Sequence, residues 1–228
     1  MPTLNAGRVG IVAGNLESSF ADSRVNSGGG GSAATDSPTT ANGFAIQSLN
    51  SGARGGFRQR RTYIYFDTSG ITSTPTEALL KIEGSTNADS TCVLLEGGDA
   101  FGGDGDDAIT TGDFTECGIG SFTVIRADAI SWSTGTNTFT LNSAARSALA
   151  SENDTVYAVV NNAHDFLNSS PTTSTNAGID FSDTIFIDYT LPAGASEVTS
   201  ISGIVLASIE EINAIEDSNI EEINTITF

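Results

Sequence analysis

Apolar and polar residues alternate over short distances along most of the chain, a pattern typical of β-strands with one buried face. The apolar runs are short, rich in β-branched and aromatic residues, and separated by Gly, Asn, Asp, Ser or Pro. We expect strands at 43–49, 62–66, 78–82, 92–95, 122–125, 138–141, 155–160 and 184–189. Since amphipathic helices do not intervene, the sequence predicts an all-β fold, an antiparallel jelly-roll-like β-sandwich.

One helix is expected, at residues 143–150, where alanines and one leucine follow Asn142. Asn142 is placed to cap this helix, because its side-chain oxygen can accept from the first free N–H groups. A single short helix leaves the all-β assignment unchanged.

Changes in composition divide the chain into four parts. Residues 1–53 form an N-terminal arm with an apolar patch at 9–13 and a Gly/Ser-rich linker. Residues 54–192 carry the sandwich, and 193–200 resemble a hinge leading out of it. Residues 201–228 form an isoleucine-rich repeat that we expect to serve oligomerisation or anchoring.

The C-terminal repeat has a period of 11 residues and no basic residue. On a helix this period gives about 3.67 residues per turn and one apolar stripe, whereas short strands broken by turns explain it equally well. In either form the stripe needs a covering partner: copies of itself, a larger assembly, or the sandwich of its own chain. The expected interface residues are Ile201, Ile204, Ile209, Ile212, Ile215, Ile220, Ile223 and Ile226.

The charge balance excludes several partner classes. With 9 basic and 28 acidic residues, the net charge is −19, which disfavours nucleic acid and anionic membrane surfaces. The chain has a single histidine, so we expect no enzyme, no catalytic residue and no cofactor other than a calcium ion. No apolar run approaches the roughly 18 residues of a membrane span, and we expect no secretory signal peptide.

The segment 96–116 concentrates acidic residues among glycines. Calcium prefers six to eight oxygen ligands in flexible geometry, and Asp99, Asp104, Asp106 and Asp107 are the candidates to supply them. The spacing is not that of an EF-hand, and a merely solvated loop explains the same composition.

Three further side chains have a possible chemical role beside a structural one. Trp132 is the sole tryptophan, so it is either a platform for stacking a sugar ring or part of the core. His164 and Asp165 are adjacent and could transfer a proton, or His164 is a hydrogen-bonded loop residue.

The basic residues and cysteines also allow two interpretations each. Arg54, Arg58, Arg60 and Arg61 form a cluster that we expect to pair with carboxylates of the same domain or of a neighbouring subunit. The two cysteines, at 92 and 117, either form a disulfide or stay as buried thiols.

Several motifs follow one another along the middle of the chain: RTYIYFDTSGI at 61–71, EALLKI at 77–82, DAFGG at 99–103, TGDF at 111–114 and NAGIDFSD at 176–183. Their order resembles that of DNRLRE-type β-sandwich domains in bacteriophage virion proteins. This resemblance covers about 54–191, and the isoleucine-rich tail is similar to C-terminal repeats of such proteins.

The resemblance implies a structural or adhesive virion component: a tail fibre, a spike or a capsid decoration protein. It would be assembled in the host cytoplasm and leave the cell in the particle. Its implied partners are copies of itself, with a trimer favoured by analogy, other virion proteins, and a host surface glycan. The alternative is a secreted carbohydrate-binding module of a cell-surface protein. A glycan depolymerase with paired carboxylates is a weaker third interpretation.

Overall fold

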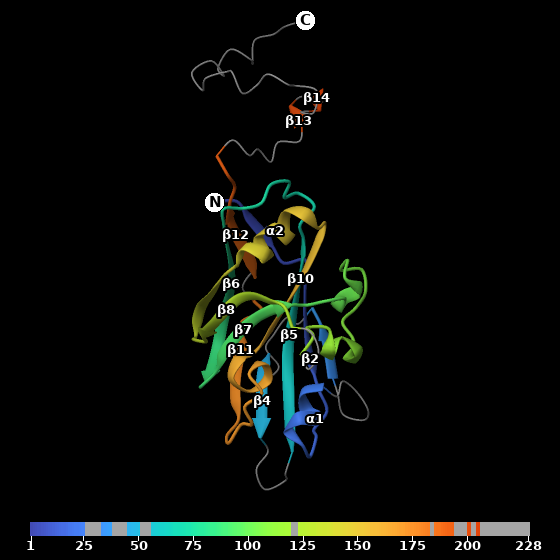
Figure 1. The fold of residues 1–228 in the computed structure, drawn as a ribbon, viewed down its shortest axis with the longest axis vertical. Coiled ribbons are helices and arrows are strands. Elements are labelled where there is room, and N and C mark those ends of the chain that lie inside the picture. The colour runs from blue at the N-terminus through green and yellow to red at the C-terminus, as the bar shows by residue number, and fades with distance from the viewer. Residues whose placement is uncertain are drawn as a thin grey trace, which may run out of the picture. The chain divides into compact units, whose positions relative to one another are not determined.

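The computed structural model describes residues 1–25, 33–37, 45–50, 56–119, 123–182 and 185–193, together with 200–201 and 204–205 of the tail. Residues 1–193 form one compact unit and residues 194–228 a second one. The first unit is built mostly of antiparallel strands, so the prediction of an all-β, sandwich-like fold is confirmed (Figure 1).

The described residues of the first unit contain twelve strands in one hydrogen-bonded sheet. Neighbours along the main path follow the order β1-β12-β6-β11-β4-β5-β10-β7-β8, while β2 and β3 join through β5, and β9 joins through β6. The strands are β1 (Thr3–Asn5), β2 (Arg8–Ala13), β3 (Ala33–Asp36), β4 (Ile46–Asn50), β5 (Phe57–Asp67), β6 (Glu77–Ala88), β7 (Thr91–Glu96), β8 (Ile125–Ser131), β9 (Gly135–Thr140), β10 (Asp154–Asn161), β11 (Thr175–Ile179) and β12 (Phe186–Thr190).

Two long strands hold the sheet together. β5 pairs with β4, β2 and β10 at successive positions, and β6 pairs with β12, β9 and β11. Each of these two strands is therefore the centre of a group of paired strands. The larger core lies between the group around β5 and the group around β6. Phe66 and Tyr157 meet there with ring centroids 6.1 Å apart, and Leu149 of α2 (Ser143–Ser151) packs against the same core. The Asn142 oxygen accepts from Ala145 N at 2.9 Å, as expected for the cap of this helix.

A second core lies on the opposite face of β2, β5, β7 and β10. Phe101 and Phe114 pack there against Tyr63 and alternate residues of β7 and β10. These two aromatic residues belong to the loop that contains the 3-10 helices η2 (Ala100–Gly102) and η3 (Thr111–Thr115). β7 and β10 therefore contact a core on each face, which is why their sequences are almost continuously apolar.

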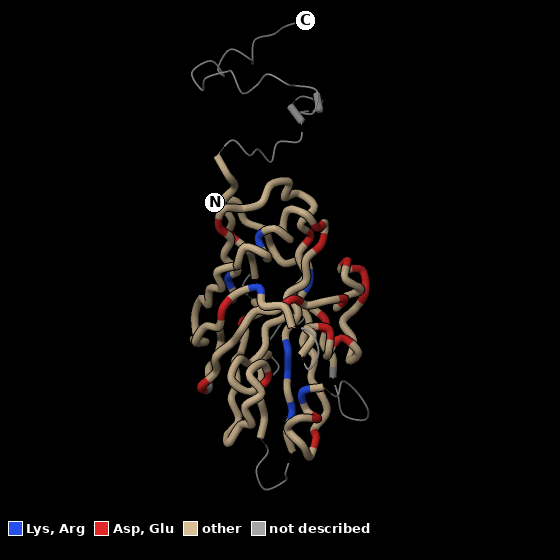
Figure 2. The backbone as a smooth tube through the Cα atoms, viewed as in Figure 1, with Lys and Arg blue, Asp and Glu red and all other residues tan. Residues whose placement is uncertain are grey.

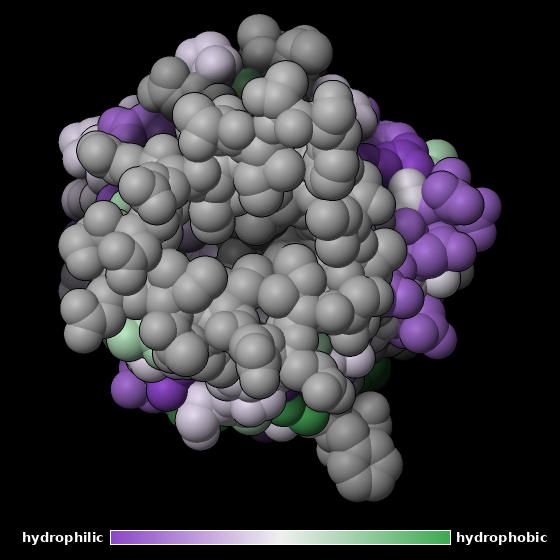
Figure 3. All heavy atoms as spheres, turned by 90° about the horizontal axis from the view of Figure 1, so that it is seen from above, coloured by the Kyte–Doolittle hydropathy of each residue, from purple (hydrophilic) through white to green (hydrophobic). Residues whose placement is uncertain are grey.

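The acidic segment is the cover of this second core. Its apolar residues point inward, whereas Asp99, Asp104, Asp106 and Asp107 are exposed. In Figure 2 acidic residues gather along the loop that contains η2 and η3, on one flank of the unit, and the same flank is hydrophilic in Figure 3. Arg8 fastens the cover, since it donates to the carbonyl oxygens of Gly105 (2.7 Å) and Asp107 (2.6 Å).

Several expected boundaries differ from the structure. The N-terminal arm is part of the sheet, because β1 pairs with β12 and β2 with β5, so the boundary expected at residue 54 runs through the fold. The strand expected at 122–125 begins only at Ile125, and β1, β3 and β11 lie where the sequence pattern predicts no strand. In the second unit β13 (Ser200–Ile201) pairs with β14 (Ile204–Val205), which agrees with the β alternative at that point.

Candidate functional site

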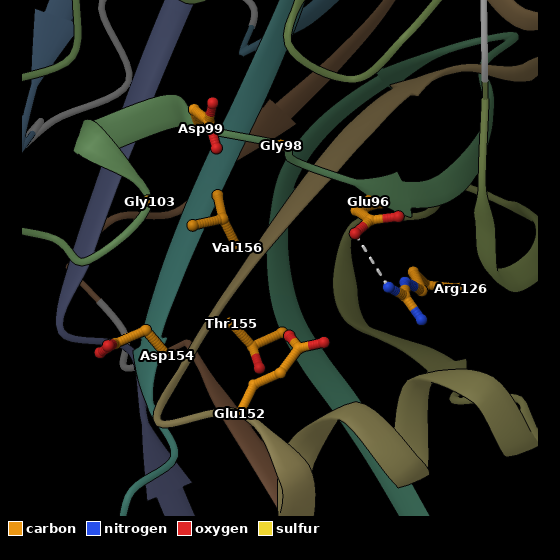
Figure 4. A pocket seen from close by; sticks show the side chains of 9 residues that line it. All are labelled: Glu96, Gly98, Asp99, Gly103, Arg126, Glu152, Asp154, Thr155 and Val156. Atoms are coloured by element: carbon orange, nitrogen blue, oxygen red, sulfur yellow. Dashed lines mark ion pairs between the residues drawn. The ribbon is translucent and has the colours of Figure 1, made fainter.

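A pocket of about 220 Å³ opens where β7 ends and β10 begins. Antiparallel pairing brings these ends together, with Glu96 opposite Tyr157. The acidic cover forms one wall and the connection from α2 to β10 another (Figure 4). The lining residues are Glu96, Gly98, Asp99, Gly103, Arg126, Glu152, Asp154, Thr155 and Val156.

Charges in this pocket are unbalanced. Four carboxylates and one guanidinium line it, and the guanidinium of Arg126 is paired with Glu96 Oε1 at 3.0 Å. Arg126 is largely buried, with 11% of its side chain exposed. On another side of the pocket, Tyr65 Oη donates to Asp154 Oδ1 at 2.5 Å. The pKa of Tyr65 is raised, first by burial and then by this hydrogen bond.

Two buried hydroxyl groups on β10 have no hydrogen-bond partner among the described residues: Thr155 Oγ1 and Tyr157 Oη. Thr155, which is 5% exposed, lines the pocket, and Tyr157 lies on the same face of the strand two residues on. Burial raises the pKa of Tyr157; Arg126 lowers it, and Glu152 and Glu96 raise it further. The charges of three residues that line the pocket therefore affect the pKa of Tyr157.

The four candidate calcium ligands do not assemble into a metal site. Among the described residues, which include all of 96–116, no three His, Cys, Asp or Glu side chains form a group that could hold a metal ion. Asp104 Oδ1 instead accepts from Asp106 N at 3.1 Å, and Glu116 Oε2 accepts from Asp99 N at 3.2 Å. The structure therefore adds no support to the calcium site expected at Asp99, Asp104, Asp106 and Asp107, which stays a prediction.

Trp132 is a core residue. Its side chain is 2% exposed, and its Nε1 donates to the carbonyl oxygen of Gly178 at 3.2 Å. A sugar ring cannot stack on a buried indole, so the sugar platform considered for Trp132 is wrong and its core interpretation is confirmed.

Asp165 is fully buried and pairs with Arg61, which is also fully buried. Arg61 Nε lies 2.7 Å from Asp165 Oδ2, and Nη2 lies 2.8 Å from Oδ1. Arg61 also donates to the carbonyl oxygens of Arg24 (2.6 Å) and Phe114, and its guanidinium lies 3.9 Å from the centroid of the Phe114 ring. Burial acts to lower the pKa of Arg61, but Asp165 and other neighbouring groups together outweigh it, and the pKa is raised.

This network fastens three loop elements to β5. Asp165 belongs to the π-turn η4 (Asn162–Phe166), Arg24 to α1 (Phe20–Val25) and Phe114 to η3. The Arg61 interaction is therefore within the domain, one of the two alternatives for the arginine cluster. Arg58 and Arg60 lie on the same strand, and Arg54 lies outside the described residues.

The remaining candidates have structural surroundings. His164 Nδ1 lies 2.6 Å from the carbonyl oxygen of Ser169, as expected for a hydrogen-bonded loop histidine, while its neighbour Asp165 faces Arg61. Cys92 and Cys117 are buried free thiols in separate cores. Ile201 and Ile204 pair in the β13–β14 ladder, and the other six interface isoleucines lie outside the described residues.

Sequence reasoning did not single out Arg126, Glu152 or Thr155. A usable signal was present, since Glu96 ends one apolar strand, while Glu152 lies just before another, β10, and Asp154 begins it. The pairing of β7 with β10, which places these ends at one pocket, is not visible in any local pattern.

No protein-family model and no curated protein matches this sequence. The resemblance to virion β-sandwich domains consequently stays a prediction. Among the described residues, the helices are all too short or too polar to span a membrane.

Proposed function

We propose that this protein is a non-enzymatic structural or adhesive component of a bacteriophage virion, of the fibre, spike or capsid-decoration type. The observation that carries the proposal is the division into a self-contained β-unit, residues 1–193, and a second unit whose sequence repeats isoleucine. Such a division suits a virion protein in which the β-unit is displayed on the particle and the C-terminal segment attaches it there.

The β-unit has features that suit exposure in a particle. Both faces of the β2-β5-β10-β7 part of its sheet are covered by cores. Its charged surface is predominantly acidic, which favours solubility at high copy number. The fully buried Arg61–Asp165 pair ties surface loops to the sheet, which supports a rigid body.

The tail supports self-association. Eight isoleucines fall at repeat positions in 201–228, and burying each contributes on the order of 2 kcal/mol before entropy is counted. A closed symmetric oligomer would cover such stripes, and we favour a trimer by analogy with fibrous virion proteins.

Mass spectrometry of particles purified by density gradient from a lysate that contains the protein tests this role. The proposal expects the chain to sediment with capsid and tail proteins at a fixed stoichiometry. Recovery of the chain only in the soluble fraction, with none in washed particles, would contradict it and favour the secreted carbohydrate-binding module.

A further inference from the structure

The pocket between β7 and β10 combines a surplus of negative charge with a buried polar group that lacks a partner. Thr155 Oγ1 is buried and lines the pocket, yet no described residue accepts or donates a hydrogen bond there. A buried hydroxyl left unsatisfied destabilises the fold, so its retention in a charged pocket indicates a ligand that completes it.

We propose that this pocket binds an amino sugar through its free primary ammonium group. The inference deepens the adhesive role proposed above and rests on it for its biological meaning. The ammonium would lie against Glu152, with Asp99 and Asp154 adding to the negative potential. The ring hydroxyls would exchange hydrogen bonds with Thr155 and Arg126.

The negative charge of the lining residues indicates that the ligand is cationic. Arg126 is already paired with Glu96, so Asp99, Glu152 and Asp154 have no cation among the lining residues. An anionic ligand would be repelled, and a neutral one would leave these carboxylates uncompensated. A primary ammonium offers three donors and one positive charge.

The lining favours a hydroxylated ring over the aliphatic stem of a lysine side chain. Val156 supplies the only large apolar side chain among the residues that line the pocket. A lysine stem is normally buried along apolar surface, which is scarce here. Polar groups on several walls suit a compact ligand with polar atoms in several directions.

Saturation-transfer NMR and calorimetric titration of the full chain with glucosamine test the proposal. N-acetylglucosamine is the matched ligand, since it keeps the ring and removes the charge, and pentylamine supplies one ammonium without a ring. We expect glucosamine to bind, and the other two to bind at least about tenfold more weakly, because charge-assisted hydrogen bonds are the strong ones.

Two variants and one control locate the site. Glu152→Gln should weaken glucosamine binding about tenfold or more, whereas Glu77→Gln on β6, with the same change of charge outside the pocket, should leave it unchanged. Thr155→Val should weaken binding about fivefold and raise the melting temperature of the free protein, because it removes an unpartnered hydroxyl.

Three results would overturn the proposal: no saturation transfer to glucosamine, equal affinity for N-acetylglucosamine or pentylamine, or wild-type affinity in Glu152→Gln. These results leave the virion role untouched, since that role depends on recovery of the chain in particles. Conversely, glucosamine binding by a chain absent from particles would keep the site and refute the virion role.

Discussion

Replacing Asp165 by Asn probes the most deeply buried ion pair of the described residues. The substitution keeps the shape of the side chain and removes its charge, so that Arg61 stays fully buried without a counter-ion. It weakens or breaks the two hydrogen bonds that Arg61 Nε and Nη2 donate to the carboxylate, at 2.7 and 2.8 Å.

The expected loss of stability is large. Breaking a buried ion pair by removing one partner costs about 3–5 kcal/mol, because the remaining charge is uncompensated. The hydrogen bonds of Arg61 to the Arg24 and Phe114 carbonyl oxygens keep the guanidinium in place, so it cannot turn toward water without releasing α1 and η3. In a unit of this size the melting temperature should fall by roughly 10 °C.

Urea unfolding followed by circular dichroism measures this change, and Asp188→Asn is the matched control. Asp188 pairs with Lys81 at 2.7 Å, but both side chains are partly exposed, so its loss should cost less than about 1 kcal/mol. Hydrogen exchange should also show faster exchange in residues 20–25 and 111–119 of Asp165→Asn. If the two variants unfold at the same urea concentration, the buried pair does not fasten these loops and the reasoning is refuted.

Two further predictions concern backbone and pH. Gly105 has φ +82°, and a Cβ added there would lie 2.5 Å from the ring of Tyr65, so Gly105→Ala should cost roughly 2 kcal/mol or more in thermal melts. Gly70→Ala, with no atom within 4 Å of the added Cβ, is its control, and equal melting temperatures would contradict the expectation. The pKa of Asp188 is lowered, first by its hydrogen bond from Lys81, so its contribution is present above the unfolded pKa of about 3.9 and is lost as pH falls through the lower folded pKa. Stability should therefore decline below about pH 4, less steeply in Asp188→Asn; identical pH profiles would contradict this.

Much of the fold is predictable from local patterns. β5, β6, β7, β9, β10 and β12 lie where short β-branched and aromatic runs occur, and α2 begins after its expected cap. β1 and β3 are short and acquire their place only through pairing with distant strands, which no local pattern reveals.

The site is less predictable, for the same reason. The composition of segment 96–116 draws attention to its carboxylates, yet its aromatic residues Phe101 and Phe114 determine its place as the cover of a second core. Asp165 stands between His164 and Phe166 in the sequence, and only the fold places Arg61, 104 residues away, against it.

The most direct test of the proposed division into a displayed β-unit and an associating C-terminal segment is the oligomeric state. Light scattering measures it for the full chain and for residues 1–193. We predict that the full chain is an oligomer, most simply a trimer, and that association strengthens with salt as the acids of 201–228 are screened. Residues 1–193 should be monomeric with the same β-type circular dichroism. Monomers from both chains across a range of salt concentrations would contradict the role assigned to the isoleucine repeat.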